Sequence, residues 1–65
     1  MGYKNVWEIT IRTREGVTAV RYVGKSSLVE PYVDWLRYLV YVTDVTSRKL
    51  SNEERKQIPF DMIIA

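Results

Sequence analysis

This chain contains no cysteine and no histidine. The lack of cysteine excludes disulfides, thiolate metal sites and cysteine nucleophiles. The lack of histidine removes the commonest metal ligand and the commonest general base at neutral pH. The serines therefore have no histidine, and no lysine at motif spacing, to activate them as nucleophiles. These absences predict a protein that is not an enzyme and that has no catalytic residue, no cofactor and no bound metal.

Long apolar runs are absent as well. The longest candidate, residues 28–46, is interrupted by Glu30, Asp34 and Arg37. No stretch therefore reaches the roughly 18 apolar residues that a membrane-spanning helix requires. Residues 1–11 alternate apolar with polar side chains and lack the continuous apolar core of a signal peptide. We expect a soluble, cytoplasmic protein with no membrane partner.

The length of 65 residues predicts a single domain that spans residues 1–65. A chain of this size buries only about 60% of the surface that it exposes when unfolded, so its stability is marginal without help. Because disulfides and thiolate metal sites are excluded, self-association or unusually good packing remains. The net charge of +2 says little about partners.

The N-terminal third has the pattern of an antiparallel β-hairpin. Residues 6–13 alternate apolar and polar side chains, Arg14-Glu15-Gly16 supplies a short loop, and residues 17–23 form the returning strand. A buried guanidinium is costly without a partner, which places Arg21 on the outer face. The expected inner face then contains Trp7, Ile9, Ile11, Val20 and Tyr22, and the outer face contains Val17, Ala19 and Val23 beside Arg21.

Residues 28–46 are unusually apolar, and at 100° per residue they form one helical stripe. The stripe is extended by Val29, Val33 and Val40 on one flank and by Tyr38 on the other. It covers roughly 220°, whereas a surface helix needs only about 100°. The members of the stripe are Leu28, Tyr32, Trp35, Leu36, Leu39 and Val42.

The ends of this helix are less sharply marked than its middle. Ser27 and Glu30 have capping-box spacing, whereas Pro31 favours a start one turn later, so the helix begins between residues 27 and 31. Residues 41–46 are rich in β-branched side chains and would suit a strand. No glycine or proline separates them from the helix, so we extend the helix to about residue 46.

A second start signal follows, where Ser51 and Glu54 again have capping-box spacing. Pro59 ends this element, which leaves a short helix, and residues 60–64 form either a third strand or an apolar arm. The predicted fold class is α+β. An N-terminal antiparallel β-hairpin packs on one long α-helix, and a short second helix and an apolar tail follow.

The surplus apolar surface of the long helix predicts a protein interface. We expect a small interaction module, homodimeric, that binds and modulates or inhibits another protein. The order of its elements is loosely similar to that of small phage-encoded inhibitor proteins, a likeness of size and layout without a shared motif. The expected interface residues are Val29, Val33, Tyr38, Val40 and Tyr41.

Nucleic-acid binding is the alternative function. Basic side chains are in surplus in residues 1–27, and Arg12, Arg14, Arg21 and Lys25 could follow a phosphate backbone. The same side chains also suit a solvated sheet face that discourages aggregation. Gly24-Lys25-Ser26 is not a phosphate-binding loop, because the motif requires a glycine where this chain has Ala19. We interpret it as a strand-to-helix turn.

Overall fold

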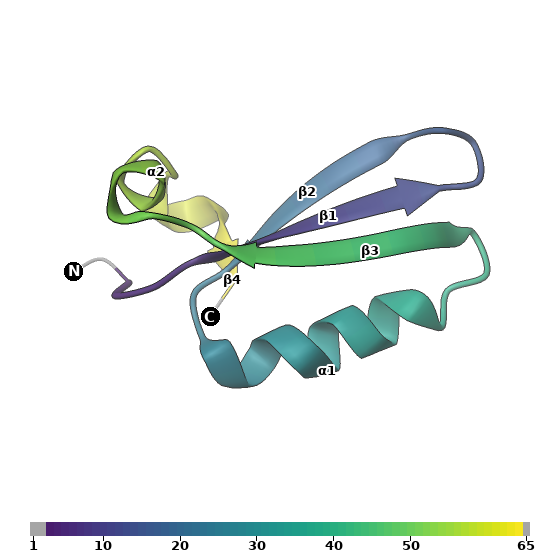
Figure 1. Ribbon diagram of the computed structural model, residues 1–65, viewed down its shortest axis with the longest axis horizontal. Helices are drawn as coiled ribbons and strands as arrows, with labels where there is room; N and C mark the ends of the chain where they lie inside the picture. The colour runs from purple at the N-terminus through teal and green to yellow at the C-terminus, as the bar shows by residue number, and fades with distance from the viewer. Residues whose placement is uncertain (1–2, 65) are drawn as a thin grey trace.

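The structure is a computed structural model that describes residues 3–64. Its strands form one four-stranded sheet in the order β3-β1-β2-β4, and α1 packs on one face of that sheet (Figure 1). The fold class is therefore α+β, as predicted. The elements, in chain order, are β1 (Trp7–Thr13), β2 (Thr18–Val23), α1 (Ser26–Arg37), β3 (Val42–Lys49), α2 (Asn52–Lys56), the 3₁₀ turn η1 (Phe60–Met62) and β4 (Ile63–Ile64).

The β1–β2 hairpin forms as predicted, but β2 faces the other way. Ile9 pairs with Arg21 and Ile11 with Ala19, and residues that pair across an antiparallel ladder lie on the same face. Val23, Arg21 and Ala19 therefore lie on the α1 face, and Val20 lies on the opposite face. The expectation that Val20 and Tyr22 lie inside and Arg21 outside is wrong.

The loop length explains this reversal. Thr13 donates its backbone N–H to the carbonyl oxygen of Val17 at 3.0 Å, so the loop between the strands has the three residues Arg14, Glu15 and Gly16. Gly16 has a φ of +80°, in the left-handed region that glycine tolerates best. An odd loop length pairs odd-numbered residues with odd-numbered ones, and this parity decides the face of every side chain in β2.

The helix in residues 28–46 is much shorter than predicted. α1 ends at Arg37, and residues 42–49 form β3. Tyr38 and Leu39 donate their N–H groups to carbonyls three residues earlier, which tightens the chain into turns. The β-branched side chains that follow then pair with β1, where they suit a pleated strand. The prediction of a helix to residue 46 is therefore wrong.

The start of α1 also differs slightly from the expectation. The helix begins at Ser26, with Lys25 as its N-cap residue and no side-chain capping bond. The Ser27–Glu30 capping box therefore does not form. Pro31 lies inside the helix and not in its first turn.

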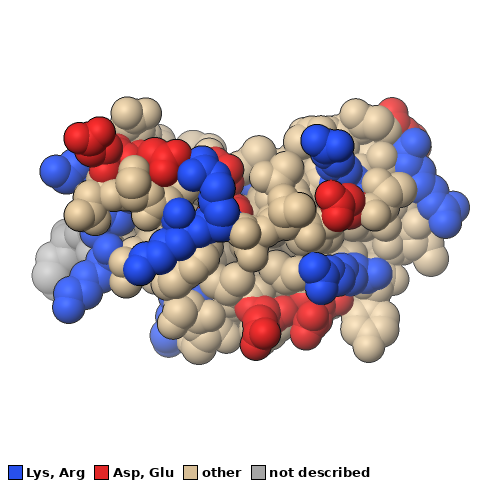
Figure 2. All heavy atoms as spheres, in the orientation of Figure 1, with Lys and Arg blue, Asp and Glu red and all other residues tan. Residues whose placement is uncertain are grey.

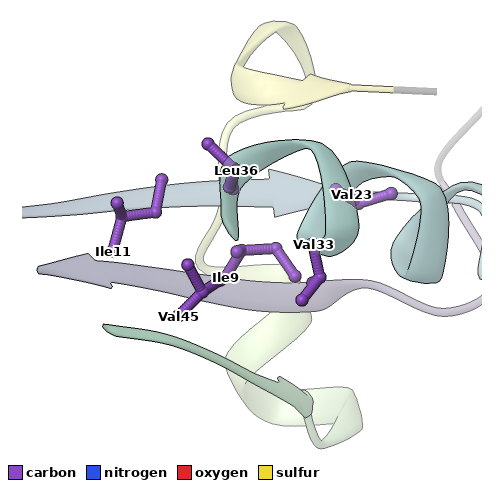
Figure 3. Packing of buried hydrophobic residues seen from close by; sticks show 6 residues of the cluster. All are labelled: Ile9, Ile11, Val23, Val33, Leu36 and Val45. Atoms are coloured by element: carbon purple, nitrogen blue, oxygen red, sulfur yellow. The ribbon is translucent and has the colours of Figure 1, made fainter. Parts of the chain in front are cut away.

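The hydrophobic core lies between α1 and the sheet face that carries Ile9 and Val23. Figure 3 shows these side chains converging from β1, β2, β3 and α1. On the opposite sheet face, Thr18, Val20 and Thr46 are exposed. The core cluster between α1 and the sheet consists of Ile9, Ile11, Val23, Val33, Leu36 and Val45.

The short helix α2 is held by the predicted capping box. Ser51 Oγ accepts from the N–H of Glu54 at 3.2 Å, and the Ser51 N–H donates to Glu54 Oε1 at 3.0 Å. Arg48 at the end of β3 donates to both carboxylate oxygens of Glu54, at 3.2 and 2.8 Å. The Arg48 hydrogen bond, followed by the Ser51 bonds, lowers the pKa of Glu54 to about 2. The tail also forms a strand, because β4 pairs in parallel with the end of β2.

Glu54 should make the stability of the fold depend on pH in acid. Its pKa falls from 4.5 to about 2 on folding, so its contribution is complete above pH 4.5 and is lost as the pH falls toward 2. We expect Glu54→Gln to be less stable than the wild type at pH 7, and its stability to decline less steeply across that window. Urea melts at several pH values measure both effects.

Glu53→Gln is the matched control for this experiment. Glu53 lies beside Glu54 in the first turn of α2, and within residues 3–64 its side chain makes no ion pair. The stability of Glu53→Gln should fall with pH as steeply as that of the wild type. Equal slopes for Glu54→Gln and the wild type would show that the contact with Arg48 contributes nothing to the fold.

Candidate protein-binding groove

Two of the predicted interface residues are not available to a partner. Val33 is buried in the core, and Val29 is partly buried against it. Val40 does not share a helix flank with them, because it lies in the turn between α1 and β3. The expected continuous valine flank therefore does not exist, since that side of α1 is the side that packs on the sheet.

The other predicted residues do lie on the surface, around the turn that follows α1. Tyr38 is 86% exposed, Val40 81% and Tyr41 54%. Trp35, which the sequence places in the buried stripe, is 57% exposed. It precedes Tyr38 by one turn of the helix, so the end of α1 and the following turn present an aromatic surface.

Trp35 also lies in a groove between α1 and β2. Two adjoining hollows, with volumes of about 290 and 300 Å³, share Tyr32 and Trp35 in their walls. We call them together the α1–β2 groove. The Tyr32 and Trp35 rings stack with their centroids 6.2 Å apart and an interplanar angle of 21°. The groove walls also include Ala19, Arg21, Leu28, Leu39 and Tyr41.

Among residues 3–64, Arg21 is the single basic side chain in the walls of this groove. Its Nη1 donates to the carbonyl oxygen of the neighbouring Val20 at 2.8 Å. In the described part of the chain the ion pairs all involve Arg48, so no carboxylate neutralises Arg21. The groove therefore combines aromatic walls with one cation that has no acidic partner.

The outer edge of β2 is free beside the groove. β4 pairs only with Tyr22 and Val23. For residues 18–21, no strand within residues 3–64 pairs with this edge. The backbone N–H and C=O groups on such an edge are available to a further strand.

The basic residues of the alternative function do not gather on one surface. Arg12 is in register with Thr18 and lies on the open sheet face, whereas Arg21 lies on the α1 face. Arg14 is in the hairpin loop, and Lys25 lies beyond the opposite end of β2. Figure 2 shows basic and acidic atoms interspersed over the face that it displays. The structure therefore shows no single basic track that includes these four side chains.

Residues 3–64 contain no group of three or more acidic side chains placed to hold a metal ion. Neither helix in that range is long and apolar enough to cross a membrane. Comparison of the chain with protein-family models, with curated proteins and with solved structures finds no match.

Proposed function

We propose that this protein is a small, non-enzymatic interaction module, homodimeric, that binds and modulates another protein through the α1–β2 groove. The observation that carries the proposal is the position of Trp35. This large aromatic side chain is more than half exposed, yet it is stacked on Tyr32 in the wall of an apolar groove. Exposed aromatic anchors in preformed grooves are typical of binding surfaces.

The composition of the groove supports a protein partner. Tryptophan, tyrosine and arginine are the residues most enriched among those that dominate binding energy at interfaces. Trp35, Tyr32, Tyr41 and Arg21 bring all three types into one surface. The Tyr32 and Trp35 rings are already held by stacking, so few side chains of this protein would become ordered when a partner binds. This lowers the entropic cost of binding.

The free edge of β2 defines the kind of partner segment. An extended segment can add to a free sheet edge by backbone hydrogen bonds, and pockets for alternate side chains then give specificity. Such a strand beside residues 18–21 would direct every second side chain toward Trp35. A carboxylate on that strand would neutralise Arg21. The proposed partner is therefore an extended segment with alternating apolar side chains and one acidic residue.

Selection of random peptides on the purified protein tests this proposal. We expect selected peptides to alternate apolar residues and to include one aspartate or glutamate. Trp35→Ala should weaken their binding by at least about thirtyfold, the effect of removing a central aromatic anchor. Titration calorimetry measures the dissociation constants.

Two further variants make this experiment specific. Arg21→Glu should reject the acidic peptides, whereas the same peptides with their acidic residue changed to lysine should bind it better than they bind the wild type. Val17→Ala is the control, because Val17 is an exposed apolar residue that is absent from the groove walls. Equal affinity of Trp35→Ala and the wild type would refute the groove as the binding site.

A further inference from the structure

The outer edge of β3 is a second free sheet edge, separate from the groove. β3 pairs with β1 along one side, and the strand order places it at the end of the sheet. It is 8 residues long, from Val42 to Lys49. In the described chain its outer backbone groups therefore meet no other strand, which makes the edge a template for pairing with another chain.

The two charged side chains that β3 places on the open sheet face are arranged symmetrically about one residue. Asp44 and Arg48 lie on the open sheet face, because they are in register with Arg12 and Glu8 of β1. Thr46 lies midway between them on the same face. Asp44 has no ion-pair partner within residues 3–64. Arg48 is held in place by Glu54 and Glu8 while its side chain stays half-exposed.

This symmetry matters for pairing between two copies. When two identical antiparallel edge strands pair about a two-fold axis, one residue lies opposite its own copy. With Thr46 on the axis, Asp44 lies opposite Arg48 of the partner subunit, and this contact occurs twice. An axis at Asp44 or at Arg48 would instead oppose like charges, and an axis at Val45 or Ser47 would pair no charges.

We propose that two copies of the chain dimerise through β3, in antiparallel register with Thr46 on the two-fold axis. This inference specifies the homodimer of the proposed function and rests on it. Each protomer then contributes its four strands to one continuous sheet, with both copies of α1 on the same face. Because β2 lies on the other side of β1 from β3, both α1–β2 grooves stay open, and the dimer is bivalent.

A cysteine substitution tests the register directly, since the natural chain contains no cysteine. Opposed residues of an antiparallel pair have Cα atoms about 4.5–5.5 Å apart, within the range that a disulfide can bridge. Thr46→Cys should therefore form a covalent dimer under mild oxidation. Thr18→Cys is the matched control, because it places the same side chain on the exposed open face at the edge of β2. Equal cross-linking of the two variants would overturn the proposal.

The charge pairs provide a second test, measured by sedimentation at micromolar concentrations. In Asp44→Arg, position 44 of one protomer and position 48 of the partner both carry a positive charge. In Arg48→Asp both carry a negative charge, so each variant should weaken dimerisation by at least about tenfold. A mixture of the two variants restores opposite charges and should form a heterodimer. Asp61→Arg carries the same charge change outside β3 and should dimerise like the wild type. A wild type that stays monomeric would refute the proposal. So would a mixture that does not associate although circular dichroism shows both variants to be folded.

The β3 interface and the α1–β2 groove can be tested independently of each other. Trp35→Ala should leave sedimentation unchanged, and Asp44→Arg should leave the affinity of a single groove for a selected peptide unchanged. Loss of dimerisation in Trp35→Ala would place the interface in the groove and overturn the β3 proposal. If the wild type binds no peptide while the Thr46→Cys variant still cross-links, the groove is refuted and the β3 interface stands.

Discussion

Replacing Ile9 with alanine is expected to unfold a large fraction of the molecules at room temperature. Ile9 lies in the central part of the sheet, faces α1 and is 0% exposed. An isoleucine-to-alanine change at such a site costs about 2–5 kcal/mol, because it removes buried methyl groups and leaves a cavity. A domain of this size has roughly 3–10 kcal/mol of total stability, so the change removes much of it.

Urea denaturation followed by circular dichroism measures this loss, and Val20→Ala is the control. Val20 lies on the open sheet face and is 37% exposed. Its truncation leaves no enclosed cavity, so we expect a loss below about 1 kcal/mol. If Val20→Ala were as damaging as Ile9→Ala, β2 would face the opposite way from the register described above, and the core would have different members.

The features predicted correctly from the sequence are those set by local patterns. The alternation of Trp7, Ile9 and Ile11 defines a strand, and a three-residue loop with Gly16 defines a hairpin. Ser51 and Glu54 define the start of α2, because each side chain satisfies a backbone N–H of the other residue. These interactions involve neighbours in the chain, so spacing alone reveals them.

The end of α1 and the start of β3 are not predicted, because they depend on contacts between distant segments. Residues 38–46 carry helical periodicity and strand-forming residues at once, and the pairing of β3 with β1 decides between them. The face of β2 is a different case, because the hairpin loop sets it locally and the cost of burying Arg21 pointed the other way. Arg21 lies toward α1 and still stays exposed, since the free edge of β2 leaves its guanidinium accessible.

The candidate site was only partly predictable for the same reason. Tyr38, Val40 and Tyr41 were expected at the surface and are exposed there. The exposure of Trp35 is not predicted, although a stripe centred between Val33 and Leu36 places it on the exposed side of the helix at 100° per residue. The groove itself exists because α1 lies closest to β3 and leaves part of β2 uncovered. Helix placement over a sheet is a property of the whole fold, and a single helical pattern does not reveal it.

Gly24→Ala should be the second most damaging change, for a reason that local sequence does not show. A Cβ atom at Gly24 would lie 2.5 Å from Tyr3 Cδ1 and 2.9 Å from Ile63 Cγ2. The Tyr3 ring cannot move away freely, because it stacks on Phe60 with centroids 5.2 Å apart. Its backbone is also held by Arg55, which donates to the Tyr3 carbonyl oxygen at 2.6 Å. Overpacking of this kind costs about 1–3 kcal/mol.

Gly16→Ala separates this steric effect from the general cost of losing a glycine. Gly16 has a positive φ and open space around its Cα, so alanine there should cost about 1 kcal/mol through backbone strain alone. Both variants should therefore unfold at lower urea concentrations than the wild type, but only Gly24→Ala should shift the NMR resonances of Tyr3 and Phe60. Unchanged ring resonances in Gly24→Ala would mean that the Tyr3 ring does not lie against Gly24. The close approach that requires a glycine between β2 and α1 would then be absent.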